Sequence, residues 1–149
     1  MLLQKDYFCR MEIKGRIDIL KHHNLRITDC RLDVLDFFIS AGFAIATKDL
    51  EDAFTNYDRV TLYRTLNSFV KKGVIHAIPD DSGFARYGVC HDTCSPEDHK
   101  HDHMHFKCTS CGTIECIADH HVPEVVIPGY LIANIELIIN GTCKDCNSK

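Results

Sequence analysis

The 149-residue sequence has no long apolar run near its start, no excess of basic residues and no HExxH motif. Residues 1–15 carry five charged side chains and no apolar stretch as long as a signal peptide or a membrane span requires. We therefore expect a cytoplasmic protein without a membrane partner, whose thiols stay reduced. A zinc hydrolase needs an open metal position beside a general base, and the missing HExxH spacing argues against that class. We expect no enzyme and no small-molecule substrate.

Charge is spread unevenly along the chain. The formal net charge at pH 7 is −4, made up of +1 on residues 1–80 and −5 on residues 81–149. A protein that binds nucleic acid through an overall basic surface is not indicated. Any contact with DNA has to come from a local group of basic side chains in the first half of the chain.

Two pairs of cysteines form the most specific motif. Residues 112–142 separate Cys108-Thr-Ser-Cys111 from Cys143-Lys-Asp-Cys146. Two CxxC turns can supply four thiolates to one ion, which leaves no position open for a substrate. We predict a structural zinc site made of Cys108, Cys111, Cys143 and Cys146. The nine cysteines are an odd number that fits no closed disulfide framework. Two disulfides, unrelated buried thiols and a rubredoxin-like iron centre are the alternatives.

Hydrophobic periodicity predicts helices in the first half of the chain. Ile13, Ile17 and Leu20 recur at helical spacing, and a second helix is expected from Thr28 to Gly42. A short third helix is expected to be capped by Thr47, with Leu50 and Phe54 directed inward. A fourth helix is expected to begin at Asp58 and end at Gly73. Its expected buried side chains are Val60, Leu62 or Tyr63, Leu66, Phe69 and Val70.

The segments that follow the fourth helix predict a β-hairpin. Val74–Ile78 and Phe84–Cys90 have strand composition, and residues 79–83 between them are typical of a turn. A helix-turn-helix pattern followed by a hairpin indicates a winged helix. The other face of the fourth helix could contact base edges and phosphates in a major groove, or it could be an ordinary solvated surface. Its polar side chains are Arg59, Thr61, Arg64, Thr65, Asn67 and Ser68, with Lys71 and Lys72 at its end.

Two segments resemble the ferric uptake regulator family of bacterial metal-responsive repressors. They are Asp58–Ile75 (DRVTLYRTLNSFVKKGVI) and His101–Gly112 (HDHMHFKCTSCG). The resemblance implies an α+β protein with a winged-helix DNA-binding domain at 1–89, a hinge at 90–100 and an α/β dimerisation domain at 101–149. It also implies a homodimer that binds double-stranded DNA at an AT-rich palindromic operator when it is loaded with metal.

The resemblance assigns roles to residues near the fourth helix. Tyr63 and Arg64 match the tyrosine and arginine of the family's recognition helix, which implies contact with a thymine methyl and with a phosphate. Arg26 matches a basic residue that reaches the minor groove, and Arg59 and Thr61 are further candidates. For Tyr63 a place in the protein core is the alternative, because the apolar stripe of the helix also passes that position.

The family carries a second, regulatory metal site, and this sequence resembles the zinc uptake regulator branch there. His76, Cys90, His103 and His105 match the regulatory ligands of that branch, and the thiolate favours Zn(II) over iron. We therefore expect one structural and one regulatory Zn(II) per chain. His99, His101 and Cys116 are alternative ligands. His76 could instead be an ordinary strand residue, Cys90 a small core residue, and the histidines at 99–105 a flexible metal-scavenging tract. An iron- or peroxide-sensing regulator is the alternative function.

Two features depart from the family pattern. A third metal site found in many members would require ligands where this chain has Asp102 or Met104, Cys116 and Ile135, so we expect that site to be lost or rebuilt. The family's helix before the last strand is replaced by Val122–Gly129, whose two prolines and β-branched residues predict a loop or extended segment. The last strand is expected at Leu131–Ile139, with its odd-numbered residues facing the core.

Overall fold

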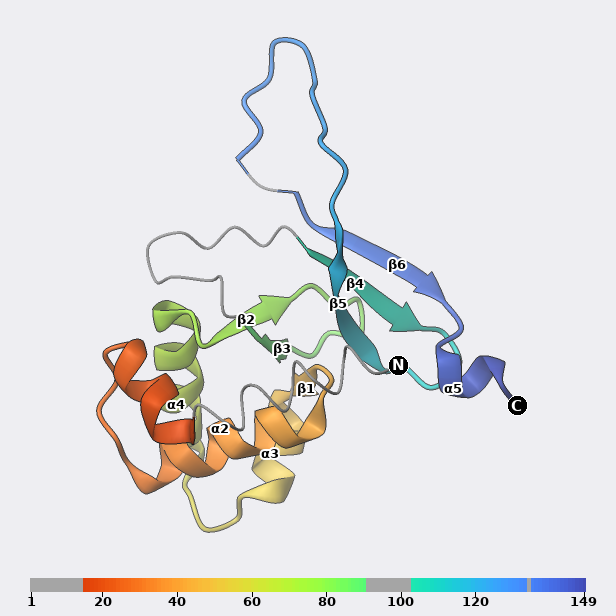
Figure 1. The fold of residues 1–149 in the computed structure, drawn as a ribbon. Coiled ribbons are helices and arrows are strands. Elements are labelled where there is room, and N and C mark those ends of the chain that lie inside the picture. The colour runs from red at the N-terminus through yellow and green to blue at the C-terminus, as the bar shows by residue number, and fades with distance from the viewer. Residues whose placement is uncertain (1–14, 91–102, 134) are drawn as a thin grey trace.

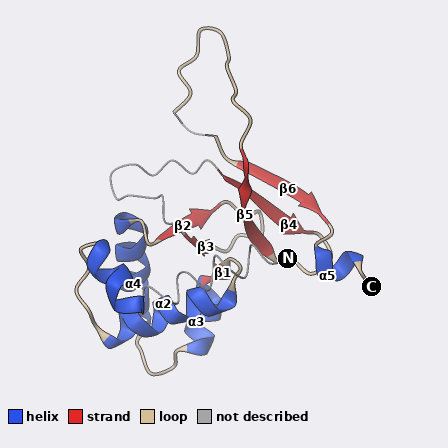
Figure 2. Cartoon of the chain, viewed as in Figure 1, coloured by secondary structure: helices blue, strands red, loops and turns tan. Residues whose placement is uncertain are grey.

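The computed structural model describes residues 15–90, 103–133 and 135–149 (Figure 1). Among the described residues, helical backbone at 15–22 is followed by four further helices and two three-stranded sheets. The helices gather on one side of the first sheet, whereas the second sheet carries only a short helix at its end (Figure 2). This arrangement confirms the expected α+β fold.

Two long helices are defined by the caps that the sequence predicts. Helix α2, Asp29–Ala41, is capped by Thr28, whose Oγ1 accepts a hydrogen bond from the Arg31 amide, and it ends at Gly42 with a left-handed φ of 71°. Helix α4, Arg59–Lys72, is capped by the Asp58 carboxylate, which accepts from the Thr61 amide at 2.9 Å. Gly73 ends α4 with a φ of 77°.

The short helix α3, Thr47–Ala53, begins one residue earlier than expected. Its cap is Ala46, not Thr47, and the Asp49 carboxylate accepts a hydrogen bond from the Ala46 amide at 2.9 Å. The Thr47 hydroxyl donates instead to the carbonyl of Ala85, in the segment that leads into β3. Leu50 is fully buried, as expected, and Phe54 packs against the core.

The buried face of α4 differs in part from the expected one. Leu62, Leu66 and Phe69 enter the core together with Val34, Leu35 and Phe38 of α2. Val60 and Tyr63, however, are 58% and 42% exposed. The prediction that Val60 is buried was therefore wrong, and so was the placement of Thr65 on the outer face, since Thr65 is only 6% exposed. A 3.6-residue period drawn through Leu62, Leu66 and Phe69 includes Thr65 and excludes the other two.

The first sheet contains the predicted hairpin. Strands β2, Ile75–Ile78, and β3, Arg86–Val89, pair antiparallel, with His76 opposite Gly88. The two-residue strand β1, Ile45–Ala46, adds to the other edge of β3 and was not predicted. The helices with this β2–β3 hairpin form a winged helix.

The second sheet consists of β4, His103–Cys108, β5, Ile114–His121, and β6, Leu137–Gly141, in the order β5-β4-β6. Strand β4 pairs antiparallel with β5 and parallel with β6. Helix α5, Lys144–Asn147, follows at the end of the chain. As expected, no helix occurs among the described residues between β5 and β6, and this connection extends away from both sheets (Figure 1). The expected strand from Leu131 was wrong, because Leu131 is fully exposed and β6 begins only at Leu137.

The two sheets are in direct contact. The Ala44 amide donates to the Ile114 carbonyl at 2.9 Å, and Ala44 and Ile114 form a small buried cluster with Ile78, with Cys116 packed against it. This contact places the residue before β1 and the end of β2 against the start of strand β5. In the described part of the chain, no helix is long and apolar enough to cross a membrane.

Candidate metal centres and recognition helix

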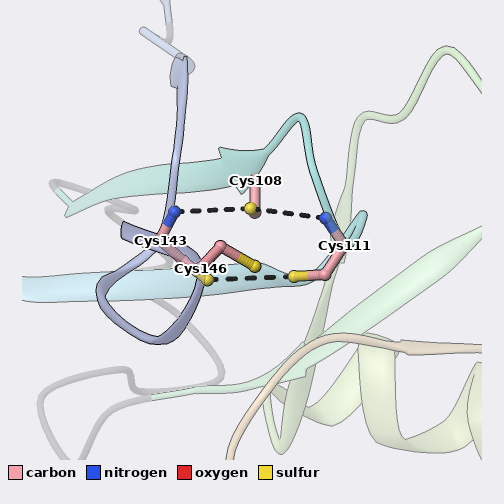
Figure 3. Close-up of side chains that lie close together, drawn as sticks. All are labelled: Cys108, Cys111, Cys143 and Cys146. Atoms are coloured by element: carbon pink, nitrogen blue, oxygen red, sulfur yellow. Dashed lines mark hydrogen bonds between the residues drawn. The ribbon is translucent and has the colours of Figure 1, made fainter. Parts of the chain in front are cut away.

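The four-cysteine cluster consists of Cys108, Cys111, Cys143 and Cys146, and it forms where β4 ends beside α5 (Figure 3). The four sulfur atoms lie within 4.8 Å of one another. The amides of Cys111 and Cys143 both donate to Cys108 Sγ, at 3.5 and 3.3 Å, so the two CxxC turns converge on one buried sulfur. The predicted pairing of the two motifs is thus seen in space.

The spacing and charge of these sulfurs suit a metal cation with tetrahedral coordination. A tetrahedron with metal–sulfur bonds of about 2.3 Å has sulfur–sulfur edges of about 3.8 Å, and Cys111 Sγ lies 3.8 Å from Cys143 Sγ. The two amide donors lower the pKa of Cys108 to about 6. Contacts with the thiols of Cys143 and Cys111 raise the pKa of Cys146 to about 12. Four thiolates at this spacing would repel one another, and a bound cation would offset that repulsion.

A second cluster, called here the mixed cluster, consists of His76, His105 and Cys116. It joins strand β2 of the winged helix to strands β4 and β5 of the second sheet. His76 Nε2 lies 3.1 Å from His105 Nε2 and 3.5 Å from Cys116 Sγ. Both histidines are buried, at 4% and 5% exposure. His105 and Cys116 are directly paired across β4 and β5, which places their side chains on one face of the sheet.

Cys90 contacts the opposite side of the His76 ring. Its Sγ lies 3.5 Å from His76 Nδ1, whereas His105 and Cys116 meet Nε2. The structure therefore brings His76, His105 and the alternative ligand Cys116 together, and it places Cys90 Sγ beside the other nitrogen of the His76 ring. His103 opens β4, but its side chain is outside the described part of the structure, as are all of His99, His101 and Asp102.

Gly88 allows the mixed cluster to close. A Cβ atom at this position would lie 3.2 Å from Cys116 Sγ, 3.3 Å from His76 Cε1 and 3.1 Å from Ile78 Cδ1. These separations are tighter than ordinary van der Waals contact, so a side chain at position 88 would occupy space that the cluster uses. The absence of a side chain at position 88 of β3 lets strand β5 approach His76.

The donor atoms of the mixed cluster fit a borderline-soft metal ion. Two imidazole nitrogens and one sulfur are typical ligands of zinc, whereas iron sites of the oxygen-rich kind use carboxylates. Burial raises the pKa of Cys116 to about 12, with the charge of Glu115 adding to the effect. The thiol is therefore neutral without a cation, and metal binding here must release a proton.

The outer face of α4 carries the predicted candidates for DNA contact and, in addition, Val60. Tyr63 is exposed, which removes the alternative that it belongs to the core, and Val60 lies one turn before it. Arg64 is exposed, while Arg59 is held by Glu51 at 2.8 Å. The Thr61 hydroxyl donates to the Asp58 carboxylate at 2.8 Å, so Thr61 takes part in the helix cap. Arg26 is exposed just before α2, and its carbonyl accepts a hydrogen bond from Arg31 Nη1 at 2.7 Å.

The sequence indicates Cys116 only as an alternative ligand and gives no signal for Gly88. The prediction that Val60 belongs to the core was wrong. The β4–β5 register that brings Cys116 beside His76 has no local sequence signal. The position of Val60, two residues before Leu62 on a helix, could have indicated exposure, because the two side chains point about 200° apart.

A winged helix joined to a second sheet that bears a four-cysteine cluster defines a metal-binding transcription regulator of the winged-helix class. Residues 22–126 match the model of the ferric uptake regulator family, and the chain belongs to this family. Its members are metal-responsive, DNA-binding transcription regulators that act as dimers and are not enzymes.

Individual relatives differ in what their names say they sense. The peroxide operon regulator of Bacillus subtilis is 27% identical over 93% of this chain and 95% of its own length. The zinc uptake regulation protein of Mycobacterium tuberculosis is 32% identical over 78% of this chain and 86% of its own length. Among solved structures, a zinc uptake regulator in complex with zinc and DNA has a TM-score of 0.60 at 22% identity, covering 97% of this chain and 95% of that one. The last comparison supports the fold.

Proposed function

We propose that this regulator is a zinc-responsive repressor of metal uptake genes that holds one structural and one regulatory Zn(II) per chain. The observation that supports the zinc assignment is the mixed cluster, where Cys116 contributes sulfur beside two imidazoles. A thiolate favours zinc over iron in competition for such a site. The 32% identity with a zinc uptake regulation protein agrees with this assignment.

The regulatory ligands that we propose are His76, His105 and Cys116, with Cys90 as the residue that fixes the His76 ring. His103 is a further candidate to complete four-coordination, as the sequence resemblance implies. The structural ligands that we propose are the four cysteines at 108, 111, 143 and 146. Their closed arrangement leaves no open position, so this site stabilises the fold and takes no part in sensing.

The division into domains that we propose places DNA binding in residues 1–89, a hinge at 90–100 and dimerisation in 101–149. His76 belongs to the first domain, whereas His105 and Cys116 belong to the second. A metal ion at the mixed cluster therefore links the two domains. The chain's own residues then hold α4 in one orientation relative to the dimer, which suits operator half-sites about 34 Å apart.

In this proposal, α4 enters the major groove of an AT-rich palindrome. Val60 and Tyr63 give α4 an apolar surface for thymine methyl groups, and Arg64 offers a phosphate contact. Arg26, just before α2, reaches into the adjacent minor groove in this proposal. Arg59 and Thr61 have lesser roles, because Glu51 and Asp58 already bind their side chains.

The test is a measurement of zinc per chain in the homodimer before and after mild chelation. Binding to an AT-rich palindromic duplex is followed at fixed salt in each state. We expect two zincs to fall to one, with operator binding lost and then restored by added zinc. A single tightly held zinc, with DNA binding that responds to iron or peroxide, would contradict zinc sensing and support the alternative function within the same family.

A further inference from the structure

A group of ionised side chains forms a further link between the winged helix and the second sheet. Asp80 lies in the turn of the β2–β3 hairpin, Arg86 begins β3, and Lys107 lies near the end of β4. Lys107 Nζ donates to Asp80 Oδ1 at 2.6 Å, and Arg86 Nε donates to Asp80 Oδ2 at 2.7 Å. Lys107 Nζ also pairs with Asp81, the next residue of the turn.

The Asp80 carboxylate is the centre of this group. Its side chain is 1% exposed, whereas those of Arg86 and Lys107 are 24% and 23% exposed. Ser82 adds its hydroxyl and its amide as donors to the same carboxylate. The Lys107 ammonium, followed by the Ser82 hydroxyl, holds the pKa of Asp80 well below its usual range. A carboxylate this buried needs its charged partners, so the turn is held where Lys107 can reach it.

The ion pairs lie close to the mixed cluster along the chain. His76 is on β2, four residues before Asp80, and His105 is on β4, two residues before Lys107. The two sheets also meet where the Ala44 amide donates to the Ile114 carbonyl. The pair between Asp80, in the turn after β2, and Lys107, on β4, adds a contact beside the mixed cluster, so Lys107 restricts how His76 can approach His105.

We propose that Lys107 is a positioning residue that ties the hairpin turn to the second sheet without metal and thereby aligns His76 with His105 and Cys116. The alignment of regulatory ligands rests on the proposed function, whereas the tie itself does not. Part of the closed arrangement of the two domains then exists before metal binds. Metal binding therefore has to order less of the protein.

The tie also changes the charge that the hairpin turn can present to DNA. With Lys107 in place, Asp80 and Asp81 are balanced by Arg86 and Lys107. When the two domains separate, the turn retains two carboxylates and one guanidinium, which leaves one net negative charge on the wing. Phosphates repel such a turn, so loss of the tie disfavours operator binding as well as metal binding.

The experiment compares the wild-type protein with Lys107→Met, Lys107→Arg and Lys149→Met. Lys149 is an exposed lysine of the same domain, and its substitution changes the charge equally without touching the hairpin turn. Small-angle X-ray scattering gives the radius of gyration of the mildly chelated protein. Zinc titration then gives the affinity of the regulatory site at low and at moderate salt. Circular dichroism and one tightly held zinc per chain verify that each variant is folded.

Lys107→Met is expected to enlarge the chelated protein and to weaken regulatory zinc binding about 5- to 10-fold. Lys107→Arg is expected to retain most of the compactness and most of the zinc affinity of the wild-type protein. Lys149→Met is expected to match the wild type in both. Unchanged scattering and unchanged zinc affinity for Lys107→Met would overturn the proposal. If the wild-type protein binds only one zinc, the zinc-sensing function fails, and the scattering comparison still decides whether the tie exists.

Discussion

Among single residues, Cys90 and Cys116 carry the clearest distinction, because both thiols touch the same imidazole from opposite sides. Cys116 meets His76 Nε2, which also faces His105, whereas Cys90 meets Nδ1. A histidine that binds metal through one nitrogen is usually oriented through the other. We therefore propose Cys116 as a ligand and Cys90 as the group that orients the imidazole.

Substitution separates these roles. Cys116→Ser is expected to abolish binding of the regulatory zinc, while Cys90→Ser is expected to weaken it about 10- to 100-fold, as for outer-shell partners of metal ligands. Zinc titration measures both, and cobalt substitution reports the number of bound thiolates through the sulfur-to-cobalt absorption band. Cys108→Ser serves as the contrast, because it removes a structural ligand and should unfold the protein. A stronger loss for Cys90→Ser than for Cys116→Ser would reverse the assignment.

Among the structural elements, strand β3 decides how closely the two sheets approach. Gly88 lies opposite His76, and a Cβ atom there would lie 3.2 Å from Cys116 Sγ, closer than ordinary van der Waals contact. Gly88→Ala is expected to weaken regulatory zinc binding by about 10-fold while leaving the structural zinc in place. Zinc counting together with titration tests this expectation. Gly83→Ala is the matched control: it strains the same hairpin at a φ of 80° but meets nothing within 4 Å. Equal effects of the two variants would mean that hairpin strain, not crowding of the cluster, is responsible.

We propose that helix α4 makes two kinds of DNA contact, which operator binding can distinguish. Tyr63→Ala is expected to weaken operator binding about 5- to 100-fold and to relax the preference for thymine, because an apolar base contact is lost. Arg64→Ala is expected to weaken all duplexes alike and to lower the slope of log K against log salt by about one. Fluorescence anisotropy on operator and scrambled duplexes at several salt concentrations measures both. A Tyr63→Ala variant that loses affinity equally for the two duplexes would remove base recognition from this residue.

The sequence predicted where helices begin and end better than it predicted which residues lie side by side in the fold. Thr28, Gly42, Asp58 and Gly73 each mark a helix end, because caps depend on local backbone chemistry. The two CxxC turns were paired correctly for a similar reason, since a closed four-thiolate cage has few arrangements. The role of Cys116 depends on the register between β4 and β5, and the exposure of Leu131 depends on where β6 begins. Both are properties of tertiary packing that no local pattern specifies.

At the scale of the whole molecule, the mixed cluster and the Lys107 ion pairs both cross between the winged helix and the second sheet. In the proposed function, their effects on metal binding and DNA binding are coupled through one closed arrangement of the two domains. If closure favours the operator by about 1–3 kcal/mol, zinc at the regulatory site raises operator affinity about 5- to 150-fold. Thermodynamic linkage then requires operator DNA to tighten that zinc site by the same factor.

This reciprocity can be measured in one protein without substitutions. Regulatory zinc affinity is determined by competition with a chelator, first alone, then with saturating operator duplex, and finally with a scrambled duplex as the control. We expect the operator to tighten zinc binding and the scrambled duplex to have a much smaller effect, because only the operator selects the spacing of the two α4 helices in the dimer. Equal zinc affinity in all three conditions, with zinc still bound at two per chain, would show that the mixed cluster binds metal without controlling the orientation of α4.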